Sequence, residues 1–228
     1  HDLGGYPIVN GQTIGGDMPV EEAGNGLIMT AAIAKMEKNA SYAEKHWKTL
    51  TQWVEYLLEN GTDTGDQLTT DNFAGDCPHH ANLSAKGILG IAAYARLAEM
   101  LNKKEEAKKY MNVAGEMAKE WEMAAYAGDH YRLAFDQPDS WGMKDNLVGL
   151  NLFPERVIQK ETDFYLTKMN EFGCPLDSRH SYTKVDWTVW TASLSADRMQ
   201  FRKLMLPLHK FMNETTDRTP MADLINTD

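Results

Sequence analysis

Cysteine is scarce in this sequence, whose 228 residues include only Cys77 and Cys174. Neither residue belongs to a CxxC motif or lies at the spacing from histidine that zinc ligands show, so the pattern disfavours a structural zinc site. The two thiols are expected either to form one disulfide, if the protein is exported, or to remain buried and free.

Long apolar runs and basic stretches are missing as well. No run approaches the roughly 18 apolar residues that a membrane-spanning helix needs, so no membrane span is expected. The formal net charge is -10, from 33 acidic and 23 basic residues, and no basic stripe is interleaved with aromatic residues. Nucleic acid is therefore not expected as a partner. The content of 43% hydrophobic and 25% charged residues is that of a soluble globular protein.

A signal peptide is also missing, because the chain opens on His1 without a charged segment followed by an apolar one. The chain has no initiator methionine either. We therefore expect it to be a processed or excised piece of a longer protein.

Strand-like alternation is rare, whereas helical spacing of apolar residues recurs along the chain. Helices are predicted over residues 19–38, 41–60, 83–101, 103–126, 154–172, 186–194 and 199–213. Residues 131–135 are predicted to be briefly extended, and the tail after residue 213 to be irregular. Helix, turn, helix and polar loop repeat at a spacing of roughly forty residues. This pattern predicts a single all-α domain over residues 1–228, with helical hairpins stacked in a ring or solenoid.

Pro19 marks the start of the first helix, because proline is favoured at the first helical position and Glu21 and Glu22 follow in the first turn. A purely structural interpretation of both glutamates is that they complement the helix dipole. Gly24 and Gly26 lie inside the same helix, where each costs about 1 kcal/mol relative to alanine. Their presence predicts that another backbone or a ligand approaches closely there.

Two polar loops are candidates for a functional site. The loop over residues 62–82 contains TTDNFAGD, and irregular loops of this length are usually functional or disordered. The loop over residues 173–187 combines both charge signs with a histidine, which titrates near neutrality. Its side chains of interest are Asp177, Arg179, His180, Lys184 and Asp186. An ion-pair loop that merely joins two helices would have the same composition.

His79 and His80 are the remaining candidates for metal ligands. They are adjacent rather than four residues apart on a helix, and no carboxylate spacing completes a site. We expect neither a metal ion nor another cofactor.

Several motifs occur in an order that resembles the fungal secreted glutaminase A family and its bacterial relatives. They are HDLGG at His1, MPVEEAGN at Met18, TTDNFAG at Thr69, NLSAKGILGI at Asn82, GLNLFP at Gly149 and PLDSRHSYTKVDW at Pro175. The chain departs from this family between Trp141 and Asn151, where it is a few residues shorter than the resemblance implies.

The resemblance implies an α/α toroid, which would be incomplete in this chain and would gather its long polar loops at one rim. It also implies L-glutamine amidohydrolase activity and a secreted or periplasmic protein. Further N-terminal and C-terminal regions, which the chain would contact, are part of the same expectation. The family name assigns no catalytic roles, so the polar clusters nominate a site without a mechanism.

The predicted site draws on all of these clusters. The candidate catalytic residues are Glu21, Glu22, Asp71, Asp177, His180 and Lys184. The candidate substrate-binding residues are His1, Asp2, Asn25, Asp136, Trp141, Arg179 and Tyr182. We expect Asp71, Asp177, Arg179 and His180 to lie in one pocket with Glu21 or Glu22, facing a small-molecule substrate that is L-glutamine or a saccharide.

Three alternative chemistries stay open on the sequence alone. Ser181 and Lys184 fit an S-x-x-K pattern, in which lysine deprotonates a serine one helical turn away. Paired carboxylates would instead suit an inverting glycoside hydrolase, with Trp141 and other aromatic residues stacking on sugar rings. The third alternative is a non-catalytic ligand-binding domain.

Overall fold

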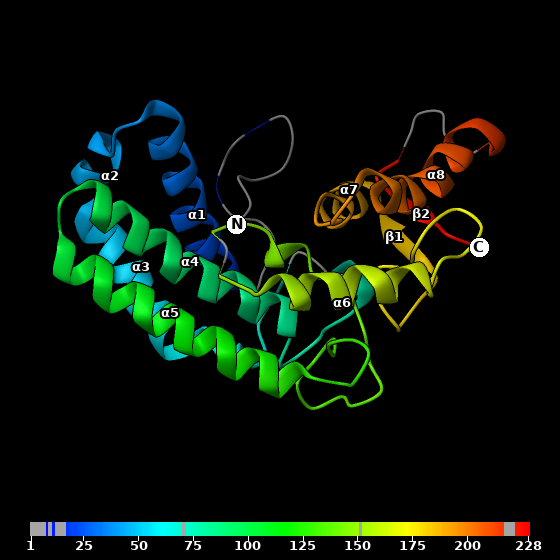
Figure 1. Cartoon of the computed structure of the whole chain (residues 1–228), viewed down its shortest axis with the longest axis horizontal. Helices are drawn as coiled ribbons and strands as arrows, with labels where there is room; N and C mark the ends of the chain where they lie inside the picture. Colours follow the sequence, from blue (N-terminus) through cyan, green and yellow to red (C-terminus); the bar gives the residue numbers. More distant parts are fainter. Residues whose placement is uncertain (1–7, 9–10, 12–16, 70–71, 151, 217–221) are drawn as a thin grey trace. The chain divides into compact units, whose positions relative to one another are not determined.

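The computed structural model describes residues 8, 11, 17–69, 72–150, 152–216 and 222–228. The predicted site residues His1, Asp2 and Asp71 therefore lie outside the described residues. The chain divides into two compact units, residues 1–118 and 119–228, called unit 1 and unit 2 below. Helix dominates the described residues, and their named strands form one two-stranded sheet (Figure 1). The predicted all-α class is confirmed.

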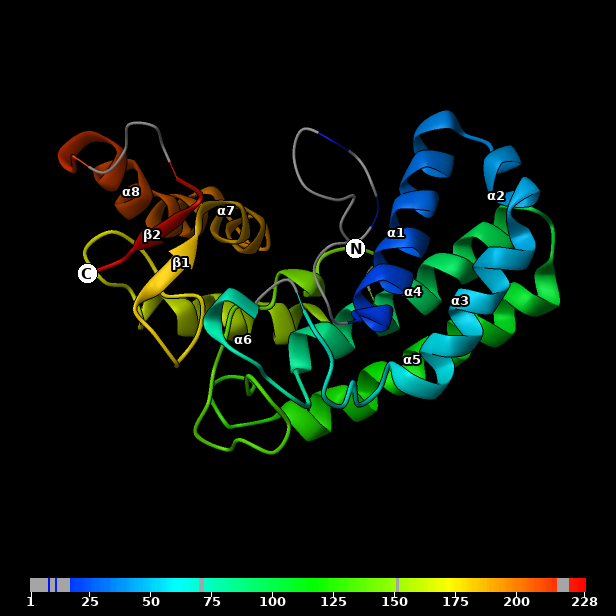
Figure 2. The same cartoon turned by 180° about the vertical axis from the view of Figure 1, so that it is seen from behind.

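Unit 1 is built from packed helices. They are α1 (Pro19–Glu37), α2 (Ser41–Lys45), α3 (Trp47–Asn60), the short 3-10 helix η1 (Asn72–Ala74), α4 (Ala81–Met100) and α5 (Lys104–Ala125), whose last residues belong to unit 2. The helix α4 is buried along nearly its whole length and packs against α1 and α3 (Figures 1 and 2). Its small residues allow this position, because alanine and glycine let neighbouring helices approach.

The predicted helix over residues 41–60 is wrong in one respect, because it is divided at His46 into α2 and α3. His46 leaves the helical conformation, with φ -109° and ψ 13°. The next residue, Trp47, stacks on Tyr94 of α4 with ring centroids 4.5 Å apart. This contact joins residues that are distant in the sequence, so helical periodicity could not reveal the break.

Gly24 meets another backbone, as predicted, since its Cβ position lies 3.3 Å from the Lys86 carbonyl oxygen, whereas Gly26 faces a side chain instead. A Cβ atom at Gly24 would lie 2.9 Å from Lys86 Cγ, and one at Gly26 would lie 2.6 Å from the Trp53 ring. Across the same interface, a Cβ atom at Gly90 would lie 3.1 Å from Gly24 Cα. Two glycines thus face each other between α1 and α4.

Replacing Gly90 with valine tests this interface. The new side chain would overlap Leu57 Cδ1, which lies 2.9 Å from the Cβ position, and we expect a loss of about 1–3 kcal/mol in the free energy of unfolding. Gly115→Val is the matched control, because nothing lies within 4 Å of its Cβ position. The control should be neutral or slightly stabilising, since valine favours helix more than glycine does. Equal midpoints of urea denaturation for the two variants would contradict this account of the interface.

Unit 2 contains shorter elements. They are η2 (Asp145–Leu147), α6 (Glu155–Leu166), β1 (Tyr182–Lys184), α7 (Val185–Ser193), α8 (Arg198–Glu214) and β2 (Leu224–Asn226). The helices α7 and α8 agree with the prediction to within one residue at each end. The segment predicted as extended over residues 131–135 forms an isolated bridge between Tyr126 and Tyr131 instead of a strand.

The prediction for the tail is wrong, because β2 pairs with β1 in antiparallel register, with Thr183 opposite Ile225. Ile225 is buried and packs with Leu208 and Phe211 of α8. A strand of three residues is too short to show a period, and its partner lies about forty residues earlier, so the sequence pattern could not predict it.

The helix α6 also ends at Leu166, whereas the prediction extended it to residue 172. Beyond the helix end, the Phe172 amide donates to the Thr227 carbonyl over 2.8 Å, and the Phe172 ring packs edge-on against Phe211 with centroids 5.7 Å apart. Contacts to the tail and to α8 therefore take this segment out of the helix. None of the described helices is both long and apolar enough to cross a membrane.

Candidate functional site

In unit 1, a buried carboxylate lies at the start of α1. Glu21 is only 3% exposed and forms an ion pair with the Lys86 ammonium of α4. Asn25, one turn further along α1, donates its amide to Glu21 Oε1 over 3.1 Å. Because Gly24 has no side chain, the aliphatic part of Lys86 can pass close to α1 and reach Glu21. Glu21 therefore does more than complement the helix dipole.

The neighbouring glutamate has a different environment. Glu22 is exposed and lines a cavity of about 300 Å³ together with Trp53 and Tyr56 of α3. The start of α1 is also fastened to the polar loop that follows α3, because Gln67 Oε1 accepts a hydrogen bond of 2.9 Å from the Val20 amide. Glu21 and Glu22 thus lie beside the predicted functional loop.

Within that loop, His79 adopts a left-handed backbone conformation with φ 58°. Its Nδ1 atom lies 2.7 and 2.9 Å from the two carboxylate oxygens of Asp63. Among the described residues, no group of three His, Cys, Asp or Glu side chains is arranged to hold a metal ion.

In unit 2, two irregular segments pair side by side. The Met143 amide donates to the Leu176 carbonyl over 2.8 Å, and the Ser178 amide donates to the Trp141 carbonyl over 2.9 Å. Gly142 and Asp177 form the bridge between these two bonds. We call residues 141–143 and 176–178 the site ladder. It places Trp141 beside the polar loop over residues 173–187.

The site ladder carries a buried carboxylate that holds a guanidinium group. Asp177 Oδ2 lies 2.6 Å from Arg179 Nη2, and Asp177 Oδ1 accepts from Arg179 Nε over 3.1 Å. The same Oδ1 atom accepts from the Arg179 backbone amide over 2.8 Å. The Asp177 side chain is 3% exposed and that of Arg179 19%. This two-pronged contact fixes the orientation of both groups.

The other predicted residues of unit 2 differ in their environments. His180 is exposed and stacks on Tyr182, with ring centroids 4.8 Å apart. Trp141 packs edge-on against Phe164 with centroids 5.7 Å apart, and Asp136 is exposed. Lys184 forms an ion pair with Asp223, which lowers the pKa of that carboxyl.

The S-x-x-K hypothesis for Ser181 and Lys184 is wrong in its geometry. Residues 182–184 form a strand, and residues three apart along extended backbone face opposite sides. Ser181 donates its hydroxyl to Asn226 over 3.0 Å, whereas Lys184 pairs with Asp223. The helical turn that would bring the lysine to the serine is absent.

The sequence analysis missed a buried ion pair that contacts the site ladder through the Gly142 carbonyl. Lys144 Nζ lies 3.3 Å from Glu161 Oε2 of α6, and both side chains are 1% exposed. Tyr165 donates its hydroxyl to the same carboxylate, and burial raises the pKa of this phenol well above its usual range. The one signal in the sequence is the spacing of Glu161 and Tyr165, four residues apart on the buried face of α6.

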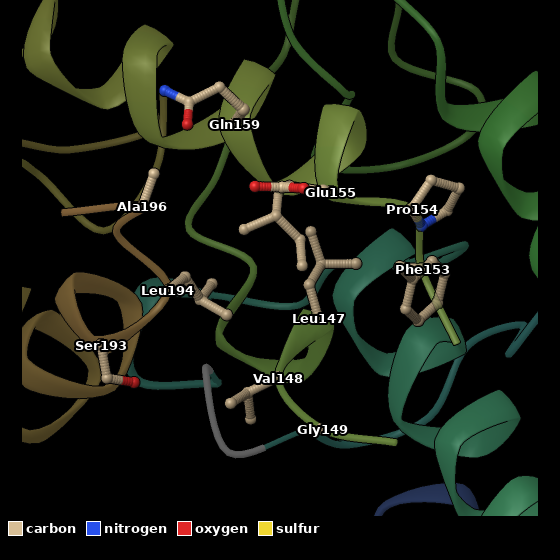
Figure 3. A pocket seen from close by; sticks show the side chains of 11 residues that line it. Leu147, Val148, Gly149, Phe153, Pro154, Glu155, Gln159, Ser193, Leu194 and Ala196 are labelled. Carbon is tan, nitrogen blue, oxygen red and sulfur yellow. The ribbon is translucent and has the colours of Figure 1, made fainter. Parts of the chain in front are cut away.

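A cavity of about 510 Å³ lies elsewhere in unit 2. Gly149, Phe153 and Pro154 of the GLNLFP motif line it, while Leu147 and Leu194 extend toward the same space (Figure 3). None of the predicted site residues that the structure describes is among its lining residues. The predicted single pocket stays a prediction, because Asp71 lies outside the described residues and the other members divide between the two units.

Both cysteines are free and buried, so the second alternative for the thiols holds in this structure. Burial raises the pKa of the Cys174 thiol far above its usual range. A thiol that stays protonated is a poor nucleophile.

Comparison with known proteins gives one family over the whole chain. The family described as the glutaminase A six helical-hairpin domain matches residues 1–228. Glutaminase A of Aspergillus oryzae is 34% identical over 241 residues, which cover 100% of this chain and 34% of that protein. A protein of Arthroderma benhamiae named as a probable glutaminase is 27% identical over 261 residues, covering 99% of this chain and 30% of its own. The chain thus spans about a third of the length of these two relatives.

Proposed function

The chain belongs to the glutaminase A six helical-hairpin family, and from this premise we propose that it is the hairpin domain of an amidohydrolase that releases ammonia from L-glutamine. The observation that carries the proposal is the 34% identity to a glutaminase A along the entire chain. Six hairpins also agree with the all-α toroid that the motifs predicted. Contacts with further N-terminal and C-terminal regions, and export from the cytoplasm, are parts of the same proposal.

The charges of the two units suit a zwitterionic substrate. L-Glutamine carries an ammonium and a carboxylate, and both signs occur together in the Asp177–Arg179 pair and in the Glu21–Lys86 pair. We assign the Asp177–Arg179 pair to the substrate, with Arg179 facing its carboxylate, because guanidinium groups bind carboxylates in a two-pronged geometry. We keep Glu21, Glu22 and Asp71 as candidate carboxylates for proton transfer.

The test measures ammonia release from L-glutamine by the full-length protein, beside sugar release from a panel of glycosides. We expect ammonia release in the wild type and a loss of at least about 100-fold in Asp177→Asn, the lower end of the effect of removing an acid–base or orienting group. Asp129→Asn is the matched control, because its side chain is 79% exposed, and its activity should equal that of the wild type. Sugar release that Asp177→Asn abolishes, without ammonia, would replace the amidohydrolase by a glycoside hydrolase. If neither ammonia nor sugar is released, a ligand-binding domain is favoured.

A further inference from the structure

The site ladder rests on an ion pair that the proposed reaction does not use. Lys144 directly follows residues 141–143, and its Nζ atom donates to the Gly142 carbonyl over 2.9 Å and to the Tyr131 carbonyl over 2.8 Å. The third contact of this ammonium is Glu161 Oε2 at 3.3 Å. A lysine has three N–H donors. These three contacts, which come from three different segments, therefore fix the ammonium in one position.

Glu161 completes the arrangement from α6. Its Oε1 atom accepts from the Tyr131 amide over 2.7 Å, while Oε2 accepts from the Tyr165 hydroxyl. The Tyr165 hydroxyl also accepts from the Lys144 amide over 3.0 Å. The buried pair and Tyr165 together therefore bind the backbone of residues 131, 142 and 144 to α6.

Gly142 connects the buried pair to the candidate site, because it forms a bridge with Asp177. A Cβ atom at Gly142 would lie only 3.2 Å from Asp177 Cβ, so the two backbones meet without an intervening side chain. Any shift of the Gly142 carbonyl would displace the bridge to Asp177 and, with it, the Arg179 guanidinium. Buried pairs of this kind add little net stability compared with apolar residues of similar volume, which leaves positional specificity as a reason to keep one.

We propose that Lys144 and Glu161 are positioning residues, which hold the site ladder so that Asp177 and Arg179 meet the substrate beside Trp141. The support that Lys144 and Glu161 give to the site ladder does not depend on which reaction the protein catalyses. Its effect on turnover rests on the proposed glutaminase activity. The two claims therefore need separate measurements.

The first measurement is hydrogen exchange of the Met143 and Ser178 amides in native Glu161→Gln and Lys144→Met. We expect both amides to exchange at least about tenfold faster, because the ladder opens locally when its support is lost. Glu161→Gln keeps an oxygen for the Tyr131 amide and is the variant designed to remain folded. The control is Arg156→Met, which removes the ion pair between the exposed Arg156 of the same helix and the partly buried Glu122, and which should leave both amides unchanged. Unchanged exchange in Glu161→Gln would overturn the inference, whatever the enzyme does.

The second measurement separates KM from kcat for L-glutamine in the full-length protein, at a temperature where all variants are folded. Misplacing Arg179 removes binding that the ground state and the transition state share, so KM should rise about tenfold while kcat changes less. Arg156→Met should leave KM unchanged, although it removes an ion pair. Faster exchange without a change in KM would restrict the pair to a structural role and overturn its assignment to the site. A wild type that releases no ammonia would refute the proposed function. The hydrogen-exchange measurement would then still test whether Lys144 and Glu161 hold the site ladder in place.

Discussion

Replacing Lys86 with methionine is expected to lower the free energy of unfolding by about 3–5 kcal/mol, because it leaves the Glu21 carboxylate buried without its cation. The side chains of Lys86 and Glu21 are 10% and 4% exposed, so water cannot replace the lost partner. The amide of Asn25 would remain as a hydrogen-bond donor, but it carries no charge. Urea denaturation followed by circular dichroism measures the change.

Arg96→Met provides the matched control on the same helix. Arg96 Nη1 lies 3.0 Å from Glu99 Oε2, and these side chains are 48% and 65% exposed. An exposed pair contributes at most about 1 kcal/mol, so this variant should unfold close to the wild type. If Lys86→Met were no less stable than Arg96→Met, the buried Glu21–Lys86 pair would not exist in solution.

Trp121→Ala is expected to cost about 3–5 kcal/mol, the range for truncating a large aromatic side chain in a core. Trp121 is fully buried, with its ring 5.3 Å from that of Tyr131 and 5.1 Å from that of Phe153 between centroids. Its removal would leave a cavity beside the segment that carries Tyr131. The amide of that residue binds Glu161, so the loss should extend to the support of the site ladder.

Trp190→Ala removes the same side chain from an exposed position. Trp190 of α7 is 51% exposed and contacts Trp187 only edge-on, with centroids 6.1 Å apart. The expected loss is below about 1 kcal/mol, as for most surface substitutions. Thermal unfolding of the two alanine variants compares them directly, and similar losses would contradict the burial assigned to Trp121.

The candidate site divides into residues that the sequence nominated and residues that it missed. Asp177 and Arg179 were nominated because a loop without helical period that carries both charge signs stands out in any sequence. Lys86, Lys144 and Glu161 were missed, because each lies in a segment whose pattern or composition gives no sign of function. The burial of a charged residue can be inferred only when its partner of opposite charge is known. The partners in the Lys86–Glu21 and Lys144–Glu161 pairs lie at least 17 residues apart in the sequence.

The sequence by itself determined the helical class and most helices, including α1, α4, α5, α7 and α8, because apolar spacing and helix-end signals act within a few turns. It also determined the close approach at Gly24, since a glycine inside a helix needs a reason beyond propensity. Only the tertiary structure decided the pairing of β1 with β2, the break at His46 and the partners of the buried charges. These features depend on contacts between distant segments, whose energies no local pattern records.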